Sequence, residues 1–122
     1  MQVLHLHDEW FQLVQSGKKT YEGRRKTILI DNIKVGDILE IRNYNKPTAP
    51  FRVCVTEKIN YPTFEDALKD LPLEEVLPVE DITVERGVEI YKRYVSIETQ
   101  KRDGVVMLKL DVIRDMPTEV TD

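Results

Sequence analysis

The chain has 122 residues and a formal net charge of −4 at neutral pH, with 41% hydrophobic and 33% charged residues. These values predict one globular domain with its own core, and they exclude a protein that binds nucleic acid indiscriminately through a large excess of positive charge. No apolar run approaches the length of a membrane helix, no signal-peptide pattern is present and Cys54 is the single cysteine, so we expect a cytoplasmic protein without membrane association.

The N-terminal half of the sequence is predicted to be rich in strands. Residues 2–6 alternate as a short strand, and a helix with an apolar stripe follows. Asp8 is the expected N-cap of this helix, and Gly17 is expected to end it and to deliver the next residues to the rim of a pocket. Residues 27–32 fit either a strand or a loop. Further strands are predicted over residues 20–26, 38–42 and 51–56.

The second half is predicted to be helical until its last strand. Thr63 and Thr83 are suitable N-caps, and Pro72 ends the first of the two helices that they begin. Residues 73–77 are expected to form a single helical turn bounded by Pro78. The second helix is expected to continue to Val95, because valine and tyrosine residues recur at helical spacing up to that position. Residues 104–113 form a long β-branched run and are the best strand candidate in the chain.

The order of these elements indicates the α+β class with a sheet rich in antiparallel strands. We expect residues 1–113 to form the single domain and residues 114–122 to form a flexible tail with little apolar mass. The first and last strands flank the rest of the chain, so they could pair and close the sheet, which would remove exposed edges.

The segment from Ser16 to Arg24 combines a helix end, a turn and a strand of alternating charge. On a strand, Glu22 and Arg24 share one face, and Lys19 lies at the strand entry, so two cations would flank one carboxylate. Such a cluster can present its ammonium and guanidinium groups to an anion or to the polar edge of a base. The same pattern also fits an exposed strand with weak surface ion pairs.

The spacing Gly17, Lys19, Glu22 and Arg24 fits Gly-x-Lys-x-x-Glu-x-Arg, which resembles the signature of the ASCH domain family. The resemblance implies a small PUA-like β-barrel of about five or six mostly antiparallel strands, with helices packed across its openings. It also implies a cleft in which the cluster contacts RNA or a nucleotide. Other segments that resemble the family are Val35-Gly36-Asp37, Tyr61-Pro62-Thr63-Phe64, Leu77-Pro78 and Gly104-Val105-Val106, together with Tyr91, Tyr94 and Glu98.

Our first hypothesis is therefore a module that binds RNA or a nucleotide-like small molecule in this cleft. Lys19 and Arg24 would contact phosphate or a carbonyl group, and Glu22 would orient Arg24 and accept from an exocyclic amine. Arg25 would add positive charge, and Tyr94 would stack on a base because it lies off the apolar stripe of its helix.

The remaining aromatic and histidine side chains have other expected roles. Tyr91 and Trp10 fit the apolar stripes of their helices, so we expect core packing for both. His5 and His7 alternate on one strand, but no cysteine or carboxylate spacing completes a metal site. We therefore expect surface or pocket-rim positions for the two histidines, and neither a metal nor a cofactor.

A second hypothesis is an enzyme, either a nuclease or an amidohydrolase. Some small ASCH-like proteins act on acetylated cytidine, and the resemblance places their lysine at Lys19 and their downstream acid at Glu80. Their threonine position is occupied here by Glu22, which has no hydroxyl nucleophile but can activate water. A third hypothesis is a protein-interaction domain, because residues 57–89 hold ten acidic and three basic residues and could contact a partner.

Overall fold

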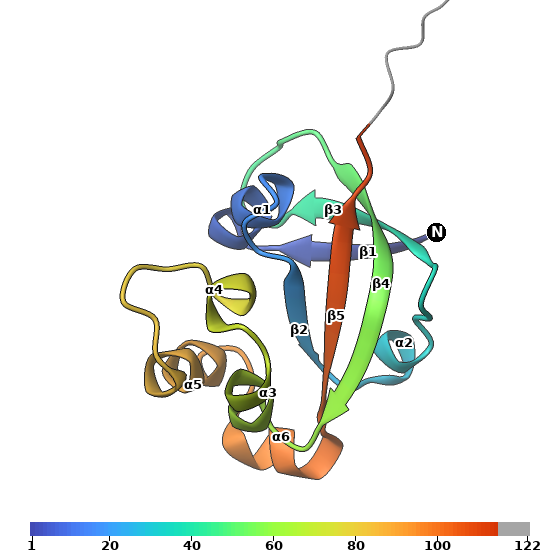
Figure 1. Ribbon diagram of the computed structural model, residues 1–122. Coiled ribbons are helices and arrows are strands. Elements are labelled where there is room, and N and C mark those ends of the chain that lie inside the picture. The colour runs from blue at the N-terminus through green and yellow to red at the C-terminus, as the bar shows by residue number, and fades with distance from the viewer. Residues whose placement is uncertain (115–122) are drawn as a thin grey trace, which may run out of the picture.

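A curled sheet of five strands forms the body of the protein, with the strand order β1-β3-β4-β5-β2 (Figure 1). The structure is a computed structural model that describes residues 1–114. Neighbouring strands are antiparallel except for β1 and β3, which are parallel. The predicted α+β class with a mostly antiparallel sheet is therefore confirmed. The strands are β1 (Gln2–Leu6), β2 (Tyr21–Arg25), β3 (Ile38–Asn43), β4 (Phe51–Tyr61) and β5 (Val105–Val112).

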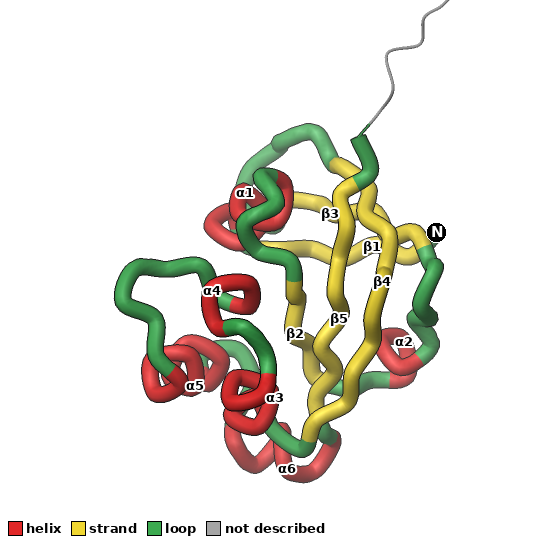
Figure 2. Tube along the Cα trace, viewed as in Figure 1, coloured by secondary structure: helices red, strands yellow, loops and turns green. Residues whose placement is uncertain are grey.

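Six short helices complete the described part of the chain, and most of them gather on one side of the sheet. Figure 2 shows α3 to α6 beside β2, whereas α2 lies on the opposite side and α1 covers the end of the sheet near β1 and β3. The helices are α1 (Asp8–Gln15), α2 (Ile28–Asp31), α3 (Phe64–Asp70), α4 (Leu73–Val76), α5 (Val84–Lys92) and α6 (Ile97–Asp103).

The central strand β5 lies between β4 and β2, and four successive residues, 105–108, are buried. A strand covered on both faces loses the alternation of polar and apolar residues, which is why this run is continuously apolar. Its partner β4 is longer than predicted. The alternation of polar and apolar residues, from which the strand was predicted, is interrupted by a register irregularity between Val55 and Glu57. The strand resumes beyond that point and continues to Tyr61.

Several predicted helix ends are confirmed, and the predicted start of α1 is wrong by one residue. The hydroxyls of Thr63 and Thr83 cap α3 and α5, and Gly17 follows α1 with a φ of 85°, which suits glycine. Asp8 is the first helical residue rather than the N-cap, which is His7. The Asp8 carboxylate instead accepts from Asn43, and this bond is the largest of the influences that lower its pKa to about 2.

Two helices were not predicted. Residues 27–32 contain α2, which the hydroxyl of Thr27 caps, so both the strand and the loop predicted there are wrong. The helix expected to reach Val95 ends at Lys92, because Ser96 caps a new helix, α6. In α6 the buried Gln100 joins three segments, since its side chain accepts from the Phe64 amide at 2.9 Å and donates to the Val95 carbonyl at 3.0 Å.

The predicted pairing of the first and last strands is wrong. β1 pairs with β3, and β5 lies between β4 and β2, so β1 and β2 are the two edges of the sheet. The guanidinium of Arg24 in β2 donates to the carbonyl of His5 in β1 at 2.8 Å, so a side chain rather than a strand ladder connects these edges.

Nothing in residues 1–114 combines the length and apolarity that a membrane-crossing helix needs. The tail predicted over residues 114–122 falls, apart from Arg114, on residues 115–122, which lie outside the described part of the chain.

We predict that Gln100→Leu lowers the free energy of unfolding by about 1–3 kcal/mol, because it leaves the Phe64 amide and the Val95 carbonyl buried without partners. Urea titration measures the effect. Gln12→Leu is the control, since Gln12 is exposed and donates only to Asp8, and it should change the stability little. Equal stability of both variants and the wild type would contradict this role of Gln100.

Candidate functional site

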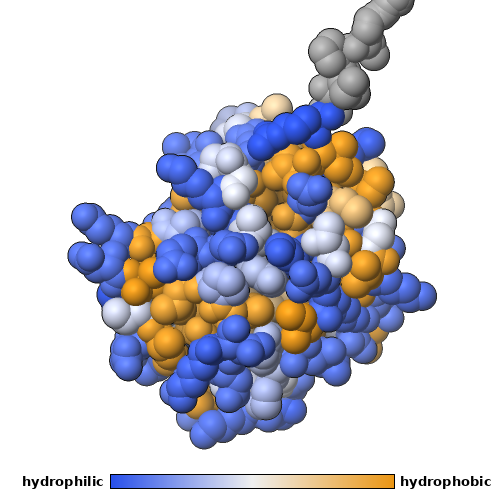
Figure 3. Space-filling model, viewed as in Figure 1, coloured by the Kyte–Doolittle hydropathy of each residue, from blue (hydrophilic) through white to orange (hydrophobic). Residues whose placement is uncertain are grey.

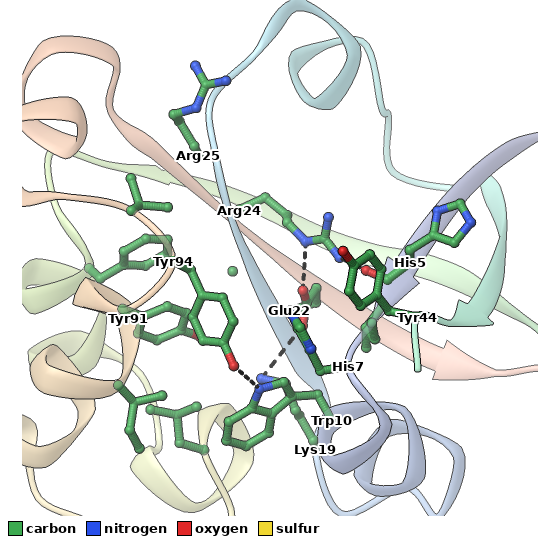
Figure 4. Close-up of a pocket in the computed structure, with 16 residues that line it drawn as sticks. His5, His7, Trp10, Lys19, Glu22, Arg24, Arg25, Tyr44, Tyr91 and Tyr94 are labelled. Atoms are coloured by element: carbon green, nitrogen blue, oxygen red, sulfur yellow. Dashed lines mark hydrogen bonds and ion pairs between the residues drawn. The ribbon is translucent and has the colours of Figure 1, made fainter. Parts of the chain in front are cut away.

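A cavity of about 320 Å³ lies at the free edge of β2, between this strand, α1, α5 and the end of β1 (Figure 4). This volume is at the lower end of the range of about 300–1,000 Å³ that is usual for small-molecule sites. The lining combines charged, aromatic and apolar residues. These are His5, His7, Lys19, Glu22, Arg24 and Arg25; Trp10, Tyr44, Phe64, Tyr91 and Tyr94; and Leu6, Gly23, Leu77, Ile90 and Val95.

The segment between α1 and β2 places Lys19 inside the protein. After the turn at Gly17, the Lys19 amide donates to the Leu13 carbonyl, and the Thr20 amide donates to the Glu75 carbonyl of α4. The ammonium of Lys19 then donates to the carbonyls of Tyr21, at 2.6 Å, and Val76. Lys19 lines the cavity, as predicted, but it is only 3% exposed, so it lies in the buried wall beside α4 rather than at the rim.

Burial lowers the pKa of Lys19 to about 8, although the nearby Glu22 carboxylate raises it and Arg24 lowers it further. The Lys19 ammonium lies 3.8 Å from Oε1 of Glu22 and 5.6 Å from the centre of the Trp10 ring. Removing this charge from water is costly, and the two carbonyls, the carboxylate and the aromatic face offset that cost.

The Glu22 carboxylate is buried between the two cations. Its Oε2 accepts from Nε of Arg24 at 2.7 Å, and its Oε1 faces Lys19 without a hydrogen bond to any residue in 1–114. Glu22 is 8% exposed and lines the cavity. The sequence prediction that Lys19, Glu22 and Arg24 form one cluster therefore agrees with the geometry.

The hydrogen bonds of the two cations are directed at the protein itself, whereas Glu22 keeps the acceptor role that was expected for it. Lys19 donates to two backbone carbonyls and attracts Glu22 by charge alone. Arg24 donates to Glu22 and to the carbonyl of His5, so both cations position the carboxylate. The oxygen that keeps a free acceptor site is Oε1 of Glu22. A ligand with a hydrogen-bond donor suits this wall of the cavity better than a phosphate group does.

Aromatic rings form the mouth of the cavity. The centroid of the His7 ring lies 4.8 Å from that of Tyr44 and 5.5 Å from that of Tyr94. The indole of Trp10 donates to the Tyr94 hydroxyl at 3.1 Å, a contact drawn in Figure 4. Tyr94 is 50% exposed, as expected for a residue off the apolar stripe, whereas Tyr44 was not predicted because it lies in a loop without a pattern.

Tyr91 belongs to both the core and the cavity. Its ring stacks on Phe64 with centroids 3.9 Å apart and planes within 7°, which fits the core position predicted for it. Its hydroxyl is buried and has no hydrogen-bond partner among the described residues, although Tyr91 lines the cavity. Burial also raises the pKa of this hydroxyl well above its ordinary value.

Of the two other predicted site residues, Arg25 borders the cavity and Glu80 does not. Arg25 lines the cavity, but its guanidinium forms an ion pair with Asp103 at 3.0 Å. Glu80 does not line the cavity: it lies exposed in the loop after α4, and its carbonyl accepts from Arg86. An acid that does contact the motif is Glu75, whose carboxylate accepts from the hydroxyl of Thr20 at 2.8 Å.

The acidic segment 57–89 covers much of the side that carries α3, α4 and α5. Nine of its ten acidic residues are exposed, and Glu75 is the exception. Figure 3 shows hydrophilic residues around apolar ones on the visible face of this region. A contact between this surface and a partner protein stays a prediction. Residues 1–114 hold no cluster of three or more histidine, cysteine or acidic residues suited to a metal ion.

The curled, mostly antiparallel sheet with helices packed beside it places the chain in the PUA-like class of α+β domains. Within that class, the chain belongs to the ASCH domain family, whose sequence model matches residues 4–114. A search of curated proteins found no match.

Several solved structures share the fold of this chain. The chain is similar to the crystal structure of hypothetical protein PH0355, with a TM-score of 0.81, 29% identity, and 92% of this chain and 98% of that chain covered. It is also similar to the solution structure of PF0455 from Pyrococcus furiosus, with a TM-score of 0.74, 27% identity, and coverages of 93% and 98%. The ASCH protein of Zymomonas mobilis shares the fold, with a TM-score of 0.63, 17% identity, and coverages of 89% and 65%.

The lowered pKa of Lys19 predicts how stability depends on pH. Between about 8, its folded pKa, and 10.5, its ordinary value, the unfolded chain binds more protons than the folded chain, so this residue stabilises the fold increasingly as pH rises. Urea titration of the wild type and of Lys19→Met should therefore show a stability difference that shifts in favour of the wild type from about pH 7 to about pH 10.

Lys18→Met, which replaces the exposed neighbour, is the control and should show no such trend. A difference between the wild type and Lys19→Met that stays constant over this pH range would contradict the buried ammonium.

Proposed function

We propose that the protein binds one nucleobase, either of RNA or of a nucleotide-like small molecule, in the cavity beside β2. The proposal rests on the buried Glu22 carboxylate, which two cations hold at the wall of a cavity with an aromatic mouth. A base has a flat apolar face for stacking and a polar edge with hydrogen-bond donors, so both parts of this lining have a counterpart in the ligand.

The size and charge of the cavity support binding of a single nucleotide. A volume of about 320 Å³ admits a base but not a run of stacked bases, and a net charge of −4 does not favour a long electrostatic track. The side chains of Arg24 and Arg25 are partly exposed, so they can attract a phosphate at the mouth of the cavity. Lys19 does not bind the phosphate in this proposal; its buried ammonium holds the Glu22 carboxylate in place.

We predict that Glu22→Gln weakens binding of nucleoside monophosphates at least tenfold, because a neutral amide is a weaker acceptor and no longer balances the two cations. The single tryptophan, Trp10, lines the cavity, so its fluorescence reports binding, and calorimetry gives the affinity.

Glu40→Gln is a matched control, since Glu40 also pairs with an arginine two residues later on a strand but lies outside the cavity lining. Failure of the wild type to bind any nucleotide or short RNA would remove the proposal, as would equal affinities of the wild type and Glu22→Gln.

A second candidate function is hydrolysis of an amide on a modified nucleoside. It is favoured by the buried Lys19, which has a lowered pKa and lies beside Glu22, so that an ammonium and a carboxylate share one wall. Lys19 would stabilise the developing oxyanion and Glu22 would activate water.

The test is turnover of acetylcytidine, followed by chromatography. We expect the wild type to release cytidine and Glu22→Gln to lose most of this activity. Absence of product at a high concentration of the wild-type protein would rule out this substrate.

A further inference from the structure

We infer that Glu22, the peptide group of Gly23 and the hydroxyl of Tyr91 together recognise the edge of the bound base, and that they select bases that carry an exocyclic amine. This inference rests on the proposed function, since it specifies which base the cavity binds. Cytosine, adenine and guanine carry such an amine, whereas uracil and hypoxanthine do not.

The first observation is the free edge of β2. The Leu110 amide donates to the Thr20 carbonyl, and the Lys26 amide donates to the Gly104 carbonyl. In an antiparallel ladder, pairs of opposite residues are alternately hydrogen-bonded and not hydrogen-bonded, and these two bonds show which pairs are bonded. The pair of Gly23 and Met107 is therefore one that is not hydrogen-bonded. The amide and the carbonyl of Gly23 therefore both point away from β5, toward the free edge.

The second observation is that Gly23 lines the cavity although it has no side chain, so backbone atoms form this part of the wall. No residue in 1–114 donates to its carbonyl or accepts from its amide. Glycine is required here by space and not by conformation. A Cβ atom would lie 2.8 Å from Phe64, 2.9 Å from the Tyr91 hydroxyl and 2.8 Å from the Met107 sulfur.

The third observation is the hydroxyl of Tyr91, a residue that is 7% exposed. Buried polar groups in native proteins nearly always have a hydrogen-bond partner, and this one has none among the described residues. Its closeness to the Cβ position of Gly23 places the hydroxyl over the face of β2 at this residue, next to the free peptide group. The hydroxyl has almost no surface open to the cavity, so a polar atom of the ligand would satisfy it when binding displaces the side chains that cover it.

The donors and acceptors of Glu22, Gly23 and Tyr91 determine which edge of a base is complementary to the cavity. Oε1 of Glu22 and the carbonyl of Gly23 accept but never donate, and they belong to consecutive residues. An exocyclic amine carries two hydrogens and can satisfy both, while the adjacent ring acceptor takes a hydrogen from the Tyr91 hydroxyl or the Gly23 amide. A carbonyl in place of the amine would set an oxygen against the carboxylate, which opposes binding of uracil.

The test compares nucleotides that differ in this group, using the wild-type protein and calorimetry. Cytidine monophosphate should bind at least about tenfold more tightly than uridine monophosphate, and adenosine monophosphate more tightly than inosine monophosphate. Equal affinities within both pairs would overturn the inference and leave the proposed function standing. Failure to bind any of the four would overturn both.

The variant Tyr91→Phe tests the hydroxyl. It keeps the stacking on Phe64 and removes a group without a partner, so its Tm should equal or exceed that of the wild type, whereas its affinity for cytidine monophosphate should fall about tenfold.

Tyr61→Phe is the matched control, because the Tyr61 hydroxyl donates to Asp70 at 2.6 Å and Tyr61 lies outside the cavity lining. It should keep the wild-type affinity. Unchanged affinity of Tyr91→Phe would contradict the role of the hydroxyl.

Discussion

The ion cluster around the buried Glu22 carboxylate is the interaction on which the site depends. A carboxylate withdrawn from water costs several kcal/mol unless opposite charges and hydrogen bonds compensate it, and Lys19 and Arg24 supply both. The two cations in turn hold other parts of the protein. Lys19 donates to Val76 of α4, and Arg24 donates to His5 of β1. Through its two cation partners, the Glu22 carboxylate on β2 is therefore linked to α4 and to β1 at the opposite edge of the sheet.

An incompletely closed sheet explains where the cavity lies. Edge strands expose unpaired peptide groups, and proteins usually cover them to avoid association with other chains. Here the helices α3 to α6 gather beside β2, and Lys19 bonds to the carbonyl of Tyr21. The peptide of Gly23 stays free and borders the cavity. The unclosed edge thus offers fixed donors and acceptors that side chains alone would not provide.

The sequence predicted the parts of this arrangement that depend on local pattern. Alternation located the strands, and the spacing of the motif placed Lys19, Glu22 and Arg24 together. The burial of Lys19 was not predictable, because it depends on a carbonyl of α4 that lies 57 residues away. The role of the Gly23 peptide depends on the pairing of β2 with β5, and the edge position of β1 depends on the order of the strands. Both are properties of the whole sheet.

The most direct test of the account is a crystal structure of the protein with cytidine monophosphate. We expect the base to lie in the cavity beside β2, with its amine within hydrogen-bond distance of Oε1 of Glu22 and the phosphate toward Arg24 and Arg25. A nucleotide bound on another face, with the cavity beside β2 still empty, would contradict it.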